Sequence, residues 1–300
     1  MTDTTTDEAT SHSAKPPKNG GQAAGYSHLT NPASEKLLDG HPKDAGQVIG
    51  YKLSVIIITK NEAANIRACL ESVTWADEII VVDSGSSDAT VEICRELGAQ
   101  VHVHDWPGFG IQKNRALSYA THEWVFAIDA DERVTHDLQS QLIKAMEDSS
   151  GDGFYVPRLS QFCGRFIRHS GWYPDYVLRL FKRTKGRFSD DMVHERVILE
   201  GTAGRLSSPL LHYSYLNEAD VQRKTEQYAK AGAMQMLKNG KAASRVDAPL
   251  RAGWAFVRTY CLRLGFLDGS AGFNIALMNA RTTYLKYNQL KALRSAKSAL

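Results

Sequence analysis

Strongly apolar runs alternate with amphipathic segments in the chain that follows residue 50. An uninterrupted apolar run is typical of a strand buried on both faces, whereas apolar residues three or four positions apart are typical of a helix. Four runs predict strands: LSVIII at 53–58, EIIVV at 78–82, QVHV at 100–103 and EWVFAI at 123–128. Four segments predict helices: 61–72, the segment of Val91, Cys94 and Leu97, 110–120, and 137–146. This alternation predicts an α/β fold with a mostly parallel sheet flanked by helices.

The pattern changes after residue 150 and again after residue 216, which predicts the domain organisation. Short strand-like pieces follow residue 150, and we expect them to extend the sheet: GFYVPRL, DYVLRLFKR, GRFS and RLSSPLLHYSY. From Asn217 onward the pattern is helical. Residues 1–50 are rich in Thr, Ser, Gly, Lys and Pro and have no apolar periodicity, which predicts a disordered extension. We therefore expect an extension at 1–50, an α/β domain at 51–216 and a helical region at 217–300.

Charge is unevenly distributed along the chain. The net charge is only +3, but from Arg223 onward fourteen Lys and Arg stand against three Asp and Glu. This segment therefore carries +11 and the remainder −8. A basic region of this kind favours an anionic partner. Nucleic acid is the weaker candidate, because no known nucleic-acid-binding module accompanies the charge.

An amphipathic segment inside the basic region favours a membrane surface as that partner. A helix over 251–266 would have one apolar face: Phe256, Val257, Tyr260 and Leu264. Arg251 and Arg258 would lie opposite, where they can meet anionic head groups. Two alternatives stay open. The helix can pack on the α/β domain with its arginines in solvent, or Arg251, Arg258 and Arg263 can contact phosphates of a substrate.

Two further features concern the compartment. The first residues lack the apolar segment of a signal peptide, and no run of about 18 apolar residues predicts a transmembrane helix. The four cysteines, Cys69, Cys94, Cys163 and Cys261, are widely scattered. We therefore expect a reduced chain in the cytoplasm, with each cysteine serving as a small core residue.

Polar clusters follow three of the predicted strands, and they carry the candidate chemistry. They are Thr59–Glu62, Asp83–Asp88 and Asp129–Asp131. Parallel strands bind ligands at their carboxyl ends, so we expect these clusters to share one rim. In the second cluster, Asp83 can accept hydrogen bonds from a nucleobase or ribose, and Ser84 and Gly85 form a flexible turn before a helix start that can receive negative charge. Alternatively, this turn only caps the next helix. The G-x-G-x-x-G pattern of dinucleotide sites is absent.

Asp129-Ala-Asp131 is the sharper motif. Two carboxylates one residue apart at the end of a buried strand repel each other unless a cation lies between them, and Mg²⁺ or Mn²⁺ prefers such oxygen ligands. Alternatively, Asp131-Glu132 simply opens the next helix. Lys113 and Arg115, in GFGIQKNRAL, can reach a diphosphate or lie on a solvated helix face.

Taken together, these residues resemble those of glycosyltransferase family 2, which has the Rossmann-like GT-A fold. The resemblance lies in SVIIITKNEAANI, EIIVVDSGSSDATVEI, GFGIQKNRAL and FAIDADE. GWYPDYVLRLFKR, DDMVHE, LLHYSY and RLGFLDGSAGF are similar, more narrowly, to lipopolysaccharide inner-core β-1,4-glucosyltransferases. The resemblance implies a UDP-sugar donor, such as UDP-glucose, and a lipopolysaccharide-core or other glycolipid acceptor. It implies an enzyme attached peripherally to the cytoplasmic side of the inner membrane.

The resemblance also implies roles for individual residues. The nucleotide-sugar contacts would be Thr59, Asn61, Glu62, Asp83, Ser84, Gly85, Lys113 and Asp129. Asp131 would be the direct ligand of a divalent metal. His212 would be a late ligand of the metal or the diphosphate, unless it is an ordinary structural histidine.

Inverting transfer also needs a carboxylate that accepts the proton of the incoming hydroxyl. Glu195 in VHE is the expected base, and Asp175 in YPDY is its rival. Two other functions remain to be separated from this one. A nucleotidyltransferase that builds sugar nucleotides would release pyrophosphate instead of UDP, and an inactive scaffold at the membrane would keep the fold without hydrolysing a nucleotide sugar.

Overall fold

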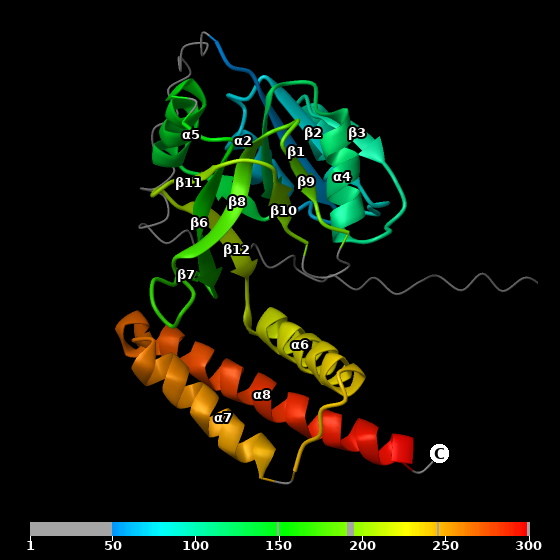
Figure 1. Ribbon diagram of the computed structural model, residues 1–300, viewed down its shortest axis with the longest axis vertical. Coiled ribbons are helices and arrows are strands. Elements are labelled where there is room, and N and C mark those ends of the chain that lie inside the picture. Colours follow the sequence, from blue (N-terminus) through cyan, green and yellow to red (C-terminus); the bar gives the residue numbers. More distant parts are fainter. Residues whose placement is uncertain (1–49, 149, 191–194, 245, 299–300) are drawn as a thin grey trace, which may run out of the picture.

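The computed structural model describes residues 50–148, 150–190, 195–244 and 246–298 (Figure 1). The predicted N-terminal extension lies outside these residues apart from Gly50. The described chain forms a sheet-centred α/β domain with a layer of three long helices beneath it (Figure 1). The predicted fold class, a mostly parallel sheet flanked by helices with a helical C-terminal extension, is confirmed.

Four parallel strands form the first half of the sheet, in the order β3-β2-β1-β4. Their bounds are Gln100–Val103 for β3, Glu78–Asp83 for β2, Leu53–Thr59 for β1 and Trp124–Asp129 for β4. Because side chains alternate across a strand, β1 sends Val55 and Ile57 to one face and Ile56 and Ile58 to the other. Both faces are covered, which explains why these strands are apolar throughout.

Helices cover the two faces separately. The face of Val55 packs against α2 (Ile66–Glu71), α3 (Thr90–Glu96) and α5 (His136–Asp148). The opposite face packs against α4 (Phe109–Tyr119). The first predicted helix is shorter than expected, since turns replace helix over 61–65.

The second half of the sheet is mixed. It continues β4-β8-β6-β12-β5, with β8 antiparallel to both of its neighbours. The bounds are Asp175–Lys182 for β8, Gly153–Phe162 for β6, Leu210–Tyr215 for β12 and Glu132–Val134 for β5. Short strands β7 (Arg165–Phe166) and β11 (Ala203–Arg205) also pair with β6, and β9 (Gly186–Phe188) pairs with β10 (Val197–Leu199).

One alternative from the sequence is wrong. Asp131-Glu132 does not open a helix, because Glu132–Val134 forms β5 and the helix begins at His136. The short strand pairs antiparallel with β12, and Glu132 stands opposite His212.

The C-terminal layer consists of α6 (Glu218–Lys238), α7 (Asp247–Val257) and α8 (Gly269–Ser298), with α8 between the other two (Figure 1). A π-helical turn (Arg258–Leu262) and a 3-10 turn (Gly265–Asp268) join α7 to α8. The expected continuous helix over 251–266 is therefore wrong, since Leu264 adopts a left-handed φ of 56°. Phe256 and Tyr260 pack on Phe273 of α8, while Leu264 is exposed.

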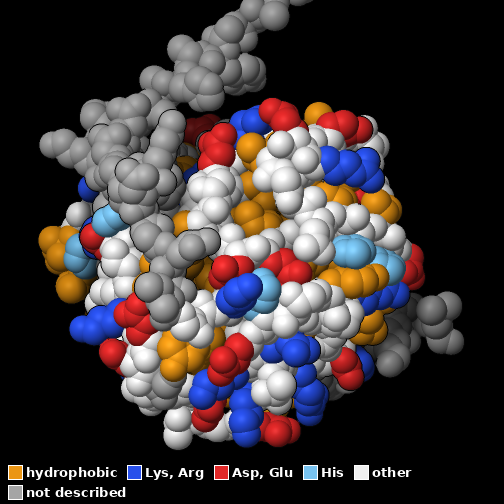
Figure 2. Space-filling model, turned by 90° about the horizontal axis from the view of Figure 1, so that it is seen from above, with side chains coloured by type: hydrophobic (Ala, Val, Ile, Leu, Met, Phe, Trp, Pro, Cys, Tyr) orange, Lys and Arg blue, Asp and Glu red, His pale blue; other side chains and the backbone are white. Residues whose placement is uncertain are grey.

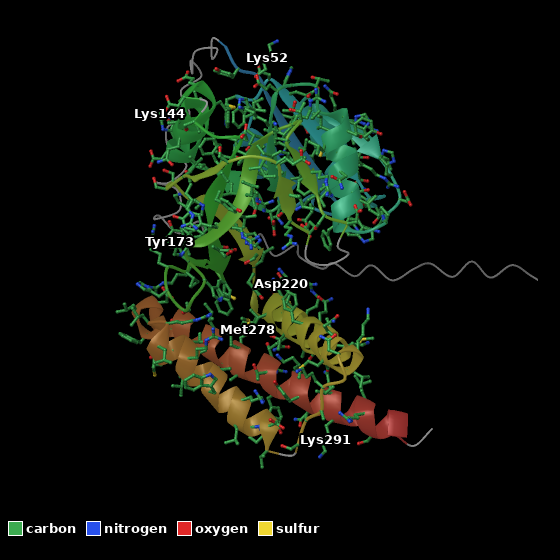
Figure 3. The ribbon with its side chains drawn as sticks, in the orientation of Figure 1. Lys52, Lys144, Tyr173, Asp220, Met278 and Lys291 are labelled. Carbon is green, nitrogen blue, oxygen red and sulfur yellow. The ribbon has the colours of Figure 1, made fainter. Side chains whose placement is uncertain are left out.

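The turn between α7 and α8 is fastened to the loop that follows β7. The buried carboxylate of Asp268 accepts hydrogen bonds from the backbone N–H of Arg168 and of His169 and from Ser170 Oγ, at 2.9–3.3 Å. The Ser170 N–H donates in turn to the Arg263 carbonyl at 2.8 Å. Tyr173, farther along this loop, lies at the end of the α/β domain that faces the helical layer (Figure 3).

The predicted burial of the four cysteines is correct for two of them. Cys69 and Cys94 are buried as expected, but Cys163 and Cys261 are exposed, because each lies in a turn at the edge of its packed element. Within the described residues, none of the helices has the length and apolar character needed to cross a bilayer.

Candidate active site

The three polar clusters share one rim of the sheet, as expected from their position at strand ends. Thr59 stands opposite Asp83 in the β1–β2 pair, and Ile58 stands opposite Asp129 in the β1–β4 pair. A cavity of about 950 Å³ opens beside this rim. Six of the predicted site residues line it: Thr59, Glu62, Asp129, Asp131, Asp175 and His212. Six others do not line it: Asn61, Asp83, Ser84, Gly85, Lys113 and Glu195.

The Asp83 carboxylate is held inside its own turn. It accepts hydrogen bonds from the backbone N–H of Gly85 at 2.9 Å and of Ser86 at 2.8 Å, and from Ser86 Oγ. Gly85 has a φ of 77°, which a residue with a side chain rarely adopts. The Thr90 N–H at the start of the following helix donates to the Asp88 carboxylate. Asp83 therefore stabilises the turn, and Asp88 binds the N-terminus of the helix.

Contacts between the first two clusters fix the backbone at the rim. Asn61, with a φ of 55°, accepts a hydrogen bond from the Ser87 N–H at 2.8 Å. Ser84 Oγ accepts one from Gln112 Nε2 of α4 at 2.9 Å. Asn61, Ser84 and Gly85 therefore fix the backbone next to the residues that line the cavity.

Three residues of the first cluster line the cavity: Thr59, Lys60 and Glu62. Thr59 Oγ1 is buried and has no hydrogen-bond partner among the described residues, so a polar ligand group would satisfy it. The Glu62 carboxylate accepts from Asn65 Nδ2 at 2.8 Å. Burial raises the pKa of Glu62, and the nearby Asp131 carboxylate adds to this rise.

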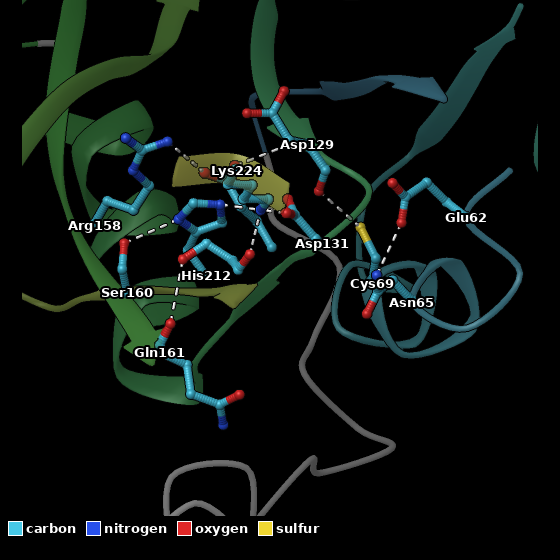
Figure 4. Close-up of polar contacts among 12 residues, drawn as sticks. Glu62, Asn65, Cys69, Asp129, Asp131, Arg158, Ser160, Gln161, His212 and Lys224 are labelled. Carbon is cyan, nitrogen blue, oxygen red and sulfur yellow. Dashed lines mark hydrogen bonds and ion pairs between the residues drawn. The ribbon is translucent and has the colours of Figure 1, made fainter. Parts of the chain in front are cut away.

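Asp131 and His212 form the candidate metal site (Figure 4). The pairing of β5 with β12 brings them together, and His212 Nε2 lies 3.3 Å from Asp131 Oδ2. The other ring nitrogen, Nδ1, lies 2.9 Å from Ser160 Oγ. Such an outer partner orients a metal-binding imidazole and frees Nε2 for the ion.

The donor set fits a divalent cation that also binds its substrate. Two ligand atoms 3.3 Å apart can share one ion at the usual bond length of about 2.1 Å. Within the described part of the chain, His, Cys, Asp and Glu form no group of three or more that could hold a metal. The remaining coordination positions would therefore belong to phosphate oxygens and water, as is usual for Mg²⁺.

A chain of ion pairs lies behind the metal candidate. Arg179 NH2, on β8, lies 2.7 Å from Asp129 Oδ2 and 2.5 Å from Glu132 Oε1. Lys113 Nζ lies 2.9 Å from Asp129 Oδ1 and 2.8 Å from Glu195 Oε1. The Lys113 ammonium is thus shared by two carboxylates beneath the cavity wall. Arg115 turns away and pairs with Asp105.

These contacts set the charge of the two inner carboxylates. Burial alone would raise the pKa of Asp129, but Arg179 and Lys113 outweigh it and hold this pKa well below its usual range. Burial raises the pKa of Glu132, and the negative charge of Asp129 raises it further against the opposing effect of Arg179. The two pKa values are therefore shifted in opposite directions, and Asp129 holds its charge more strongly than Glu132 does.

The two candidate bases lie at opposite ends of this chain. Glu195 is joined to Asp129 through Lys113, and its side chain is 17% exposed. Asp175 lines the cavity, is 44% exposed, and accepts two hydrogen bonds from Arg158 on one oxygen, at 2.7 and 3.0 Å. Arg158 also approaches Glu132, at 3.7 Å.

Sequence reasoning missed several residues of the site, among them Arg158, Ser160, Arg179, Lys224 and Tyr228. Arg179 gave a usable signal, since it is a lone cation inside the apolar strand VLRLF, where a buried partner is needed. Lys224 and Tyr228 line the cavity from α6. Nothing in their sequence distinguished them from other polar positions of a helix.

Comparisons with known proteins show the family of this chain. Residues 54–201 match the family described as "Glycosyl transferase family 2". The lipopolysaccharide core biosynthesis glycosyltransferase LpsC of Rhizobium meliloti is 31% identical over 83% of this chain and 97% of its own length. An uncharacterized glycosyltransferase of Rickettsia prowazekii is 29% identical, over 81% and 87% respectively.

Solved structures were compared as well. The glucosyl-3-phosphoglycerate synthase of Mycobacterium tuberculosis, in complex with Mn²⁺, UDP and glucosyl-3-phosphoglycerate, is 27% identical over 37% of this chain and 45% of that one, with a TM-score of 0.32.

Proposed function

Because this chain belongs to glycosyltransferase family 2, we propose that it transfers a hexose, glucose from UDP-glucose, to an inner-core sugar of lipopolysaccharide. The cavity with the Asp131–His212 pair at the carboxyl ends of the strands carries this proposal. The lipopolysaccharide acceptor rests on the relative LpsC, which the chain matches over nearly its whole length.

The donor site combines a metal with the rim of the sheet. Asp131 and His212 would hold Mg²⁺ or Mn²⁺, which supplies charge neutralisation for the donor diphosphate. Asp129 and the unpaired hydroxyl of Thr59 would bind the nucleotide-sugar from the strand ends. Asn61, Glu62, Asp83, Ser84 and Gly85 would shape the nucleotide pocket around them.

The reaction is a single displacement with inversion. The acceptor oxygen forms a bond to the anomeric carbon while the bond from that carbon to the β-phosphate oxygen breaks, and the electron pair leaves with UDP. Glu195 would accept the hydroxyl proton. Its carboxylate shares Lys113 with Asp129, which lines the cavity, whereas Asp175 is engaged by Arg158 on one oxygen. The predicted direct contact of Lys113 with the diphosphate stays a prediction, and this lysine would position Asp129 and Glu195.

A transfer assay tests the function. The full chain is incubated with extracted core oligosaccharide and UDP-glucose, UDP-galactose, UDP-N-acetylglucosamine or a GDP-sugar, with and without EDTA. We expect UDP release with UDP-glucose that EDTA abolishes, and release of pyrophosphate would refute the proposal. Asp131→Ala should lose activity, so wild-type transfer by this variant in excess Mn²⁺ would rule out its metal role. Comparing Glu195→Gln with Asp175→Asn identifies the base, because only loss of the base removes the ionisation from the pH profile of kcat.

We also propose that the helical layer attaches to the cytoplasmic side of the inner membrane. Leu250, Trp254 and Val257 are exposed along one face of α7, at spacings of four and three residues. Exposed Leu262, Leu264, Phe266 and Leu267 continue this surface through the two turns. Arg258 is exposed among them. By contrast, acidic and basic side chains are interspersed at the opposite end of the molecule (Figure 2). An apolar surface with Trp and cations suits an anionic bilayer.

Flotation with vesicles of anionic and of neutral lipid tests this attachment. The wild-type chain should float with the anionic vesicles, and Trp254→Ser combined with Phe266→Ser should reduce binding at least tenfold. Met234→Ser, at an exposed apolar residue of α6, is the matched control and should bind normally. Equal flotation of the double variant and the wild type would refute the proposed surface.

A further inference from the structure

We infer that Lys224, delivered by α6 from the C-terminal layer, binds the diphosphate of the donor and neutralises it as it leaves. This inference rests on the proposed function, and it assigns to a residue outside the sheet domain the cation that the donor site needs. The expected ligand is a nucleoside diphosphate, recognised through its phosphates and not through its base.

The position of Lys224 follows from the start of α6. Asn217 caps the helix by accepting a hydrogen bond from the Asp220 N–H at 3.0 Å. Only Leu216 and Asn217 separate the helix from β12, so its first turns stay beside that strand. Lys224 Nζ reaches back to the carbonyl of Ser214, two residues after His212. The lysine is therefore tied to the strand that carries the metal candidate, and Figure 4 shows it beside His212 and Asp131.

The Lys224 ammonium lies beside an aromatic ring, and Lys224 lines the cavity. Nζ lies 4.7 Å from the centre of the Tyr215 ring, a cation–π distance. Lys224 is half-buried and lines the cavity together with Tyr228, one helical turn later. A partly desolvated ammonium at such a place interacts more strongly with an anion than a solvated one does.

No carboxylate of the described residues engages the charge of Lys224, unlike that of three other cations near the rim. A fourth cation, Lys60, also lines the cavity but is exposed to solvent. Lys113 is bonded to two carboxylates, Arg179 to two, and Arg158 to Asp175. Within the ranges that the structure describes, no carboxylate forms an ion pair with Lys224, whose recorded polar contact is to a carbonyl oxygen. Lys224 lines the same cavity as Glu62, Asp131 and His212, which are the predicted donor-site residues.

This placement fits the charge change of the reaction. When the bond between the anomeric carbon and the phosphate oxygen breaks, the electron pair stays on the diphosphate. A metal held by Asp131 and His212 and an ammonium bonded to Ser214, two residues after His212 on the same strand, would then contact the same anion. A fixed cation aimed at developing charge lowers the barrier without reorganising during the reaction.

Binding measurements with UDP and with uridine, both in the presence of Mn²⁺, test the inference. Lys224→Met keeps the length of the stem and removes the charge. It should weaken UDP binding on the order of tenfold or more, as for loss of a hydrogen bond to a charged group, and leave uridine binding unchanged. Lys224→Arg should stay within about threefold of wild type for UDP, because the positive charge is retained. Lys230→Met, at an exposed position of the same helix, is the control and should change neither affinity.

The outcomes separate this inference from the function on which it rests. If Lys224→Met binds UDP within twofold of wild type, or loses UDP and uridine equally, the diphosphate role is refuted while the glycosyltransferase remains. If the wild type itself binds no UDP, the proposed donor site is refuted and the inference falls with it. Thermal unfolding of each variant shows whether the fold is intact, and a variant with normal unfolding and a selective loss of UDP supports the inference.

Discussion

Replacing Arg179 with Met provides a sharp test of the buried ion pairs behind the site. The guanidinium is only 4% exposed, and it lies 2.7 Å from Asp129 and 2.5 Å from Glu132. Methionine fills similar apolar space but cannot neutralise either carboxylate. Asp129 would keep Lys113 as a partner, whereas Glu132, whose side chain is fully buried, would keep only Arg158 at 3.7 Å and the Asp129 N–H at 2.9 Å. The substitution therefore destabilises the protein mainly by leaving the Glu132 carboxylate without its main partner.

The expected loss of stability depends on the unpaired charge of Glu132. Removing one partner of a buried ion pair costs about 3–5 kcal/mol, and the remaining hydrogen bond to Glu132 favours the lower end. We expect the free energy of unfolding to fall by about 3 kcal/mol, which lowers Tm by roughly 6–12 °C for a domain of this size. Arg179→Met combined with Glu132→Gln should recover at least about 1 kcal/mol of this loss, because the unpaired charge is gone.

Urea unfolding at several pH values measures these differences. In Arg179→Met the pKa of Glu132, already raised by burial, should rise further. The folded variant then binds a proton that the unfolded chain releases, so its stability increases as the pH falls. The gap between wild type and variant should narrow from pH 8 to pH 5.5. A loss below 1 kcal/mol, or a double variant no more stable than Arg179→Met, would refute the reasoning.

Further predictions follow from other parts of the molecule. In the native chain an alkylating reagent should modify the exposed Cys163 and Cys261 but not the buried Cys69 or Cys94. Burial raises the pKa of the Cys94 thiol to about 12 and that of Cys69 well above its usual range. Four modified cysteines by mass spectrometry would contradict this. Asp268→Ala should expose the 168–172 loop to limited proteolysis, since it removes the hydrogen bonds that hold this loop; an unchanged cleavage pattern would contradict it. As the pH falls below about 4, the free energy of unfolding should decrease less in Asp129→Asn than in the wild type. The depressed pKa of Asp129 means that its ionised form stabilises the wild-type fold above that pH, and this contribution is lost on protonation. Identical acid unfolding of variant and wild type would contradict this.

The sequence predicted the parallel half of the fold well, for a physical reason. Each of β1, β2 and β4 is buried on both faces, so its apolar run is continuous and its polar end is sharp. The shared rim of Thr59, Asp83 and Asp129 followed from the direction of these strands alone. The cavity itself was not predictable, because β12 and α6 reach it from far along the chain.

Two details had no local signal that could reveal them. Glu132 looks like the first turn of a helix, but pairing with β12 makes it a strand, a tertiary effect that overrides local preference. The helix predicted over 251–266 ends early because the 168–170 loop docks against the turn and Leu264 must adopt a left-handed conformation there. α6 begins at Glu218, inside the region predicted as a separate helical part, yet it lines the cavity.

The pairing of β5 with β12 has a consequence for biosynthesis. Asp131 emerges from the ribosome well before His212, and the two meet only when the last strand of the sheet is in register. A shift of one residue would turn the imidazole to the other face of the sheet. A nascent or truncated chain that ends before residue 212 therefore cannot form the Asp131–His212 pair of the candidate metal site.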